Sequence, residues 1–391
     1  MRVLITSKAG AGHLGPLLPF AHALRRARAD VLVAVPQEAV PMVRAQRLPL
    51  WAFDDPPPEE RDAIFAEVGR LPPELSGPPV VGDVFARIDA RAAYPGILAA
   101  CRAWKPDLVM SEMTEFAGPL VAEALGLPAV TVAILQMGKG AATMQSAQVR
   151  SALEDLRAEF GLDPDPDLQR ARALPCLTLL PEALEDPALP QPLPVLRFRE
   201  APNATGEALW DWWLGDERPL VYVTFGSAAP KTDLFPGVYR AAIDAVSAMS
   251  VRALVTIGRD RDPAELGPVS ANVRVEQWVP QHDVMPHAAA MLCHGGSGTV
   301  TMGLAAGVPM AVLPLFADQP WNAERVAAVG AGIALTGEPS ADAIRGALGR
   351  LLAEPAFRGS ARQVAAQTRA LPPVDAAVGV VRELLTDVLA A

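Results

Sequence analysis

Short runs of apolar residues alternate with helical stretches along most of this 391-residue chain. In the first half the apolar runs are "RVLIT" (2–6), "DVLVAV" (30–35), "DLVMS" (107–111) and "AVTVAIL" (129–135). The second half restarts the pattern with "PLVYVTFGS" (219–227), "ALVTIG" (253–258), "AMLCHGG" (290–296), "MAVLPL" (310–315) and "GIALT" (332–336). Repeated βα units of this kind build parallel sheets with helices on both faces. The sequence therefore predicts an α/β chain of two doubly wound domains.

Proline-rich segments indicate where this regular pattern is interrupted. "EDPALPQPLPVLRFREAPN" (185–203) favours an extended connection, because proline cannot continue a helix. We predict an N-terminal domain of residues 1–204, a C-terminal domain of residues 205–372 and an amphipathic helix in 373–391 that packs back across the interface. The proline-rich segment from Asp54 to Asp83 is expected to be irregular, as binding loops and lids often are.

Composition and charge exclude several classes of protein. Hydrophobic residues make up 51% of the chain, which excludes disorder, and the formal charge of −10 without a Lys or Arg run excludes a nucleic-acid footprint. No signal-peptide core and no run of about 18 apolar residues is found, so we expect a cytoplasmic protein. Cys101, Cys176 and Cys293 are odd in number and lack paired metal spacing, which predicts buried free thiols.

The stretch "LITSKAGAGHLGPLL" (4–18) contains a literal G-x-G-x-x-G from Gly10 to Gly15. A dinucleotide site also requires an acidic residue about 20 positions on, at the end of the second strand. That strand here ends "VAVPQE", where Glu38 is displaced, so an NAD-dependent oxidoreductase is the weaker interpretation. His13 lies in a glycine loop at the carboxyl end of a strand, where parallel sheets bind ligands. Its alternative role is to cap the following helix.

A second glycine loop follows the strand "AMLC" and precedes the helical "TVTMGLAAG". A helix N-terminus presents free N–H groups and a positive dipole end, which together bind phosphate. A tight turn would explain any one of the glycines alone, whereas six small or donor residues in a row favour an anion site. The candidate residues are His294, Gly296, Ser297, Gly298 and Thr299.

The segment "VEQWVPQHDVMPHAAAMLCHGGSGTVTMGLAAGVPMAVLPLFADQPWNAERV" (275–326) resembles the signature of nucleotide-sugar-dependent glycosyltransferases. "GAGHLGPLLPFAHAL" (10–24) and "VYVTFGS" (221–227) extend the resemblance in the expected order, and actinomycete antibiotic transferases are the most similar. The resemblance implies the GT-B fold, with two Rossmann-like domains facing across a cleft. The first domain would bind the acceptor and the second the nucleotide sugar.

The resemblance also implies roles for residues of the second domain. Trp278 would stack on the nucleobase, the Val279 backbone would bond the base edge, and Gln281 would frame base and ribose. Ser227 would contact phosphate, and Asp318 with Gln319 would bind the sugar hydroxyls. The alternatives are a core position for Trp278 and a helix N-cap for Asp318.

Sugar transfer to an alcohol requires a base, and histidine titrates near neutral pH. We predict His13 as this base, oriented by Glu112, with Glu115 as the second candidate; either carboxylate could instead cap a helix. A one-step displacement would invert the anomeric centre. No metal is expected, because the helix terminus and His294 would neutralise the diphosphate. The D-x-D of residues 163–167 is interpreted as a surface loop.

The acceptor site is expected in the variable segments 54–95 and 136–150, where Met137 and Met144 suit an irregular apolar ligand. We expect a hydrophobic natural-product aglycone and no cofactor beyond the nucleotide sugar. UDP-sugar enzymes of the family commonly carry a ribose-binding Glu where this chain has Met302, which favours a dTDP-linked donor. A monomer or homodimer without stable membrane insertion is expected. A non-catalytic nucleotide-sugar-binding homologue and a lipid-facing cell-wall transferase are the other hypotheses.

Overall fold

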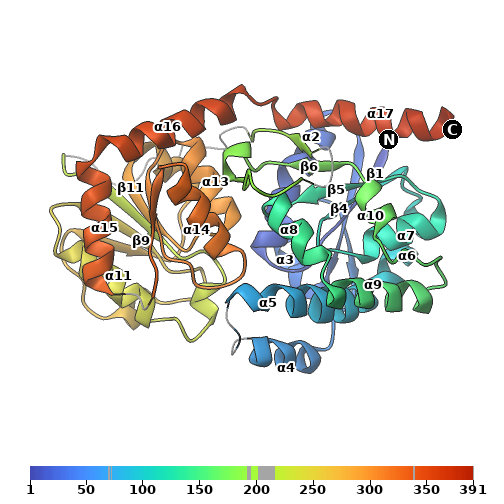
Figure 1. Ribbon diagram of the computed structural model, residues 1–391, viewed down its shortest axis with the longest axis horizontal. Helices are drawn as coiled ribbons and strands as arrows, with labels where there is room; N and C mark the ends of the chain where they lie inside the picture. Colours follow the sequence, from blue (N-terminus) through green and yellow to red (C-terminus); the bar gives the residue numbers. More distant parts are fainter. Residues whose placement is uncertain (69–70, 72, 192–194, 201–215, 338–339, 391) are drawn as a thin grey trace. The chain divides into compact units, whose positions relative to one another are not determined.

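The computed structural model describes two compact units. The described residues are 1–68, 71, 73–191, 195–200, 216–337 and 340–390. One unit comprises Met1–Leu180, Glu185–Glu200 and Pro372–Ala391, and the other comprises Pro181–Leu184 and Ala201–Leu371. Each unit contains one parallel sheet with helices packed against it (Figure 1). Residues 192–194 and 201–215 of the predicted connection lie outside the described residues.

The first unit is built on a seven-stranded sheet of order β3-β2-β1-β4-β5-β6-β7, whose described pairings are parallel. The strands are β1 (Arg2–Thr6), β2 (Asp30–Pro36), β3 (Leu50–Phe53), β4 (Leu108–Glu112), β5 (Ala129–Ala133), β6 (Cys176–Thr178) and β7 (Val195–Arg197). The order reverses between β1 and β4, and parallel sheets bind ligands outside the carboxyl ends of such a pair. The fold therefore predicts a ligand site beside these two strand ends.

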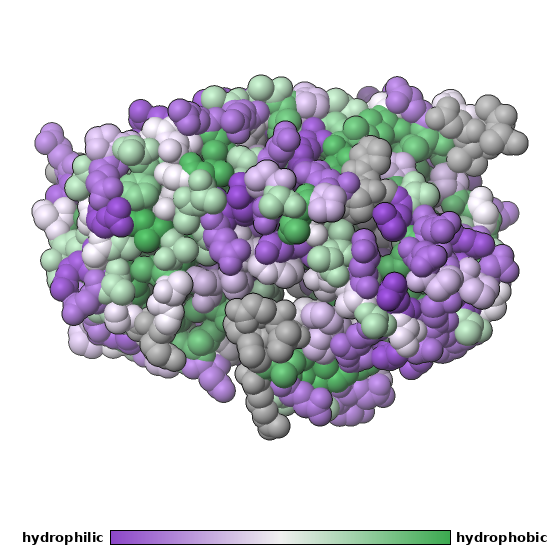
Figure 2. All heavy atoms as spheres, viewed as in Figure 1, coloured by the Kyte–Doolittle hydropathy of each residue, from purple (hydrophilic) through white to green (hydrophobic). Residues whose placement is uncertain are grey.

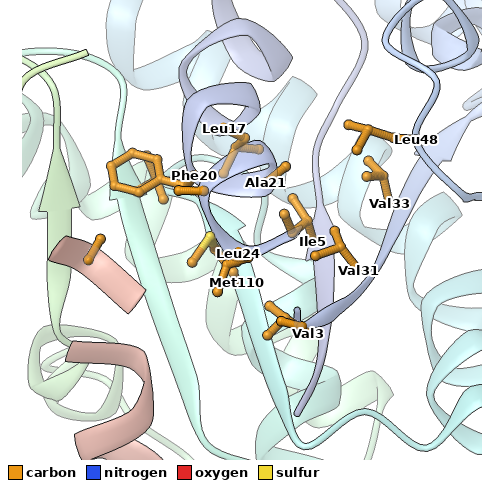
Figure 3. Close-up of a cluster of buried hydrophobic side chains, with 14 of the residues drawn as sticks. Val3, Ile5, Leu17, Phe20, Ala21, Leu24, Val31, Val33, Leu48 and Met110 are labelled. Atoms are coloured by element: carbon orange, nitrogen blue, oxygen red, sulfur yellow. The ribbon is translucent and has the colours of Figure 1, made fainter. Parts of the chain in front are cut away.

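Successive side chains of a strand point to opposite faces of the sheet. In this unit each face is covered by its own hydrophobic core. Val3 and Ile5 of β1 face one core with Phe20, as Figure 3 shows, and Leu4 faces the other. The C-terminal helix adds Val381 to the first core. The helices of this unit include α1 (Ala11–Leu14), α2 (Leu18–Arg26), α3 (Val40–Ala45), α6 (Arg91–Trp104), α7 (Ala117–Leu125), α8 (Met137–Met144), α9 (Ala147–Glu159), α10 (Gln169–Ala173) and α17 (Ala377–Ala390).

The proline-rich segment after β3 is helical, so the prediction of an irregular loop was wrong. It forms α4 (Pro58–Val68), α5 (Pro73–Pro79) and a π-helical segment, η3 (Val80–Ala90). Pro58 and Pro73 each begin a helix, where a missing N–H costs nothing and the fixed φ suits the helix. Val84 and Ala86 of η3 are buried. Pro58 and Pro73 therefore start their helices rather than breaking them, whereas Pro78 and Pro79 form the end of α5.

The second unit repeats the same plan with a six-stranded sheet of order β10-β9-β8-β11-β12-β13. Its strands are β8 (Leu220–Thr224), β9 (Arg252–Thr256), β10 (Val273–Glu276), β11 (Ala288–Cys293), β12 (Met310–Val312) and β13 (Gly332–Ala334). Its helices include α11 (Gly237–Ser247), α12 (Gln281–Val284), α13 (Ser297–Ala305), α14 (Gln319–Ala328), α15 (Ala341–Ala353) and α16 (Pro355–Ala370). The strand order reverses between β8 and β11, which places a second switch point at their carboxyl ends.

The nine apolar runs of the sequence each contain a strand, whereas β3, β6, β7 and β10 were missed. These four strands are three or four residues long, and all but the apolar β3 contain polar residues. The three cysteines are buried and free, as predicted. None of the described helices has the length and apolar character needed to cross a bilayer. On the face drawn in Figure 2, hydrophilic and hydrophobic residues are interspersed.

Candidate active site

The glycine loop after β1 brings His13 to the end of β4. Gly10 has a φ of 106°, a backbone conformation that is strained for any residue with a side chain. The chain then enters α1, which carries His13. Because β1 pairs with β4, the loop lies beside Glu112, the last residue of β4. Nδ1 of His13 is 3.0 Å from Oε1 of Glu112. The Glu112 side chain is fully buried, whereas 24% of the His13 side chain is exposed.

The charge on Glu112 decides which histidine nitrogen carries the proton. Burial opposes its ionisation, but the nearby charges of Lys8 and His13 overcome this effect and hold the pKa of Glu112 at about 2. The carboxylate also accepts hydrogen bonds from Thr114, at 2.7 Å from the backbone nitrogen. An ionised carboxylate can only accept, so Nδ1 of His13 must donate to it. A neutral His13 therefore keeps Nε2 as a proton acceptor.

Glu115, the second candidate for orienting His13, is used by a helix. Its carboxylate accepts from the backbone nitrogens of Ala117 and Gly118, at 2.9 and 3.0 Å, and from the Thr6 hydroxyl. These N–H groups belong to the first turn of α7, which has no intrahelical acceptors for them. Burial raises the pKa of Glu115 to about 7. Of the two carboxylates, Glu112 is therefore the partner of His13.

Lys8 also belongs to this site, and the sequence analysis missed it. It is buried, and its Nζ lies 3.6 Å from Oε1 of Glu112. The ammonium donates to the hydroxyl of Thr114 at 2.7 Å. The chain has only four lysines, and this one lies in the glycine loop of the candidate base. That coincidence is the signal that would have identified it.

The glycines of the loop do not meet the requirements of a dinucleotide fingerprint. The third glycine of that fingerprint allows the helix to pack closely on the strand. A Cβ added at Gly12 or Gly15 would meet no atom within 4 Å, so neither position requires glycine for space. Glu38, the displaced acidic residue, lies 3.5 Å from Arg61. The local geometry therefore does not favour the NAD interpretation.

A mainly apolar cavity of about 140 Å³ has Glu112 among its lining residues. Met137 and Met144, the predicted acceptor residues, both line it. Other lining residues are Met113, Phe116, Leu120, Leu153, Leu168 and Leu174. Its lining combines apolar side chains with some polar groups, as in many small-molecule sites. The methionines lie on α8, so this part of the predicted acceptor region is also helical.

His294 lies after β11 between two glycines that have no room for a side chain. A Cβ at Gly226 or Gly296 would come within 2.6 or 2.4 Å of its Nε2. Its Nδ1 is buried and has no hydrogen-bond partner among the described residues. Burial lowers the pKa of His294 to about 4, so the ring is neutral at neutral pH. A neutral imidazole donates a hydrogen bond from one ring nitrogen and accepts one at the other. The expectation that His294 helps to neutralise a diphosphate stays a prediction.

The predicted anion-binding residues gather around the start of α13. Gly296 is its N-cap residue, and Ser297, Gly298 and Thr299 form its first turn, where N–H groups lack intrahelical acceptors. Ser227 is exposed in the turn after β8. Because Thr224 at the end of β8 pairs with Cys293 at the end of β11, this turn starts beside the His294 loop. The sheet thus brings the two predicted phosphate-binding loops together.

A buried network connects this loop to the start of α14. The Ser297 hydroxyl donates to Asp318 at 2.6 Å, and the Asn322 amide donates to Asp318 and to the Gly295 carbonyl at 2.9 and 2.8 Å. Asp318 is the N-cap residue of α14, as the alternative predicted, but its side chain makes no capping bond to that helix. Asn322 is fully buried. The sequence analysis missed it, although it lies only four residues after Asp318.

Gln319 and Gln281 use their side chains inside the unit. The Gln319 amide oxygen accepts from the backbone nitrogens of Leu315 and Phe316, at 2.8 and 2.9 Å. The Gln281 side chain lies near the hydroxyl of the buried Tyr222. Gln281 and Gln319 are the first residues of α12 and α14. The predicted contacts of both residues with sugar, base or ribose stay predictions.

Trp278 follows β10 and is 50% exposed, so it is not a core residue. The Arg259 guanidinium lies 3.9 Å from the centroid of its indole ring. The next residue, Val279, is buried and packs in the core of the unit. Met302 is partly buried on α13 and packs against the same core. An exposed aromatic ring at the carboxyl edge of the sheet that carries the anion-binding loops fits the predicted base-stacking role.

The D-x-D segment serves the fold. Asp165 is buried and accepts from the backbone nitrogens of Gln169 and Arg170, at 2.8 and 2.9 Å, at the start of α10. The Asp163 side chain is 83% exposed and pairs with Arg170. The surface-loop interpretation was therefore correct for Asp163 but not for Asp165. Within the described ranges, no group of three or more His, Cys, Asp or Glu side chains is arranged to hold a metal ion.

Comparison with known proteins identifies the family. Residues 240–384 match the C-terminal domain described as "Erythromycin biosynthesis protein CIII-like". The L-demethylnoviosyl transferase of Streptomyces niveus is 33% identical over 340 residues, which cover 86% of this chain and 85% of that protein. The chain belongs to the family of antibiotic glycosyltransferases. This glycosyltransferase therefore has the activity class that its signature segment predicted.

Solved structures agree with the fold of this glycosyltransferase. SnogD from Streptomyces nogalater is 27% identical and aligns with a TM-score of 0.75, covering 98% of this chain and 99% of SnogD. VinC, solved in complex with dTDP, is 26% identical with a TM-score of 0.74, covering 99% of this chain and all of VinC. Two parallel-sheet domains in this order constitute the predicted GT-B fold.

Proposed function

We propose that this antibiotic glycosyltransferase transfers a sugar from a dTDP-linked donor to a hydroxyl group of a hydrophobic natural product, with inversion at the anomeric carbon. The observation that carries the proposal is the contact between His13 Nδ1 and Glu112 Oε1 at 3.0 Å beside an apolar cavity. An imidazole held by an ionised carboxylate on one nitrogen can remove a proton with the other.

In the proposed reaction Nε2 of His13 takes the proton of the acceptor hydroxyl. The acceptor oxygen then forms a bond to the anomeric carbon on the face opposite the diphosphate. The bond from that carbon to the diphosphate oxygen breaks, and the nucleoside diphosphate leaves with the electron pair. Glu112 stabilises the imidazolium that forms, as a carboxylate does in other histidine bases.

The second unit would hold the donor. The first N–H groups of α13 and the neutral His294 ring can donate hydrogen bonds to the diphosphate, and the positive end of the helix dipole stabilises its charge. These contacts supply the stabilisation that a metal ion gives in other transferases, so the proposed reaction uses none. Trp278 would stack on the nucleobase.

Two observations support the substrate classes. VinC, which is 26% identical, has been solved in complex with dTDP. Met302 offers no acceptor for a ribose 2′-hydroxyl, and a deoxyribose lacks that group. The acceptor cavity is lined by apolar side chains, among them leucines and methionines, and by polar side chains that include Glu112. This lining suits an apolar molecule, and His13, which is not itself a lining residue, is held at the cavity by Glu112.

The test replaces the base. His13→Ala should reduce turnover by about a hundredfold or more, while the affinity for dTDP stays unchanged. Product formation is followed by mass spectrometry as a gain of one glycosyl unit, across a panel of aglycones and nucleotide sugars. His22→Ala is the matched control, because His22 lies on α2 and its Nε2 is 3.5 Å from the Gln46 amide oxygen. Equal turnover by wild type and His13→Ala would exclude His13 as the base.

A further inference from the structure

Lys8 is a buried cation whose side chain is surrounded by the groups that hold His13. Its Nζ donates to the Thr114 hydroxyl at 2.7 Å and to the Thr114 carbonyl at 3.2 Å. The ammonium also lies 2.9 Å from the centroid of the Phe85 ring, which is within the range of a cation–π contact. Three elements therefore fix one charge: the loop after β1, the loop after β4 and η3.

Lys8 and His13 share their partners. Oε1 of Glu112 lies 3.6 Å from Nζ of Lys8 and 3.0 Å from Nδ1 of His13. The Phe85 ring that faces Lys8 also packs edge-on against the His13 ring, with centroids 5.4 Å apart. A change in the charge of Lys8 would therefore act directly on the carboxylate oxygen that holds the candidate base.

The other charged groups around Lys8 are carboxylates. Glu112, Glu115 and Asp89 favour its charged form, and Asp89 itself lies 3.6 Å from Arg61. Arg61 in turn lies 3.5 Å from Glu38 on the far side of this group. Burial is the largest influence and lowers the pKa of Lys8 to about 8, which still leaves the ammonium charged at neutral pH.

A buried charge of this kind is weak evidence for a role in stability. Removing an ammonium from water is costly, and an apolar side chain of similar length often replaces a buried ion pair without loss of stability. Methionine has nearly the length of lysine and could pack on Phe85 in the same place. The position of the charge, beside the oxygen that binds His13, indicates a role in setting how the base works.

We propose that Lys8 is a positioning residue for the transfer reaction: its ammonium helps to hold the ionised Glu112 in place, and its positive charge limits how tightly His13 holds a proton. The inference rests on the proposed function, in which His13 is the base. Without Lys8, the imidazolium paired with Glu112 loses a repelling charge, so the base should stay protonated to a higher pH.

The experiment measures kcat/KM for the acceptor against pH at saturating donor. Lys8→Met removes the charge, and Lys8→Gln also removes it while keeping a donor for Thr114. Both variants should move the acid limb of the profile up by about one pH unit, the shift that a neighbouring charge typically causes. At pH values on the acid side of the profile, kcat/KM of these variants should then be about tenfold lower than that of the wild type. Lys8→Arg and the exposed control Lys105→Met should keep the limb of the wild type.

The outcomes separate this inference from the proposed function. If Lys8→Gln is folded by circular dichroism and its profile is lowered equally at every pH, or is superimposable on the wild type, Lys8 does not control the base. The same outcomes for Lys8→Met would also reject control of the base by Lys8. If Lys8→Met does not fold, the pH profile of Lys8→Gln alone decides the question. If His13→Ala is as active as wild type, the proposed base fails instead. An inactive His13→Ala with unshifted Lys8 variants rejects only the role of Lys8.

Discussion

Replacing Glu112 with glutamine changes one atom of the site and removes one charge. The two carboxylate oxygens have different partners: Oε1 lies 3.0 Å from Nδ1 of His13, and Oε2 lies 2.7 Å from the Thr114 nitrogen. Both partners are N–H donors, whereas a glutamine side chain has one acceptor oxygen and one NH₂ group. With the amide oxygen on the Thr114 nitrogen, the NH₂ group faces Nδ1 of His13, and Nδ1 can accept from it only in the tautomer that carries the proton on Nε2.

The structure indicates how large the effect should be. A neutral hydrogen bond replaces one to a charged group, so the free energy of unfolding should fall by about 1 kcal/mol. Catalysis should lose more. The amide does not stabilise the imidazolium as a carboxylate does, and it favours the tautomer whose Nε2 already carries a proton and cannot act as the base. We expect kcat of Glu112→Gln to fall about a hundredfold.

The assay compares initial rates of glycoside formation at saturating donor and acceptor, with thermal unfolding measured in parallel. Glu112→Asp is the matched variant, because it keeps the charge and shortens the side chain by one methylene; it should lose less activity than the glutamine variant. The affinity for dTDP should be unchanged, since the predicted donor residues belong to the other unit. A folded Glu112→Gln enzyme with kcat within threefold of wild type would refute the reasoning.

Two further predictions concern the donor and the pH dependence of stability. In calorimetric titration UDP should bind about tenfold or more weakly than dTDP, because placing a 2′-hydroxyl against the Met302 thioether costs about 1–3 kcal/mol. Met302→Glu should narrow the difference between the two affinities. Tighter binding of UDP than of dTDP to the wild type would reject the donor assignment. Burial raises the pKa of Glu115 from 4.5 to about 7, so this carboxyl stabilises the fold below pH 4.5 and its contribution, up to about 3 kcal/mol, is lost as pH rises through 7. Glu115→Gln should therefore flatten the fall of the unfolding free energy between pH 4.5 and 8, and an unchanged slope in denaturant titrations would contradict this account.

Much of the fold could be predicted because its signals are local. The apolar runs of β1 and β8 are continuous, as expected for strands buried on both faces of a parallel sheet. The glycine loops after β1 and β11 were also visible, since a loop, its strand and its helix are neighbours in sequence. The proline-rich segment from residue 54 misled the analysis, because proline is compatible with the first turn of a helix as well as with a loop.

The sequence by itself determined two doubly wound domains, the loop that carries His13 and the signature segment of an antibiotic glycosyltransferase. Only the tertiary structure decided that Glu112 rather than Glu115 holds His13, that Lys8 shares the same oxygen, and that Asn322 joins the donor-side loops. It also decided that burial leaves His294 neutral. The physical reason is that periodicity and turn residues act over a few positions of the chain, whereas the pairing of β1 with β4 brings together side chains about a hundred residues apart. The protonation states of these side chains depend on their burial and on the neighbouring charges.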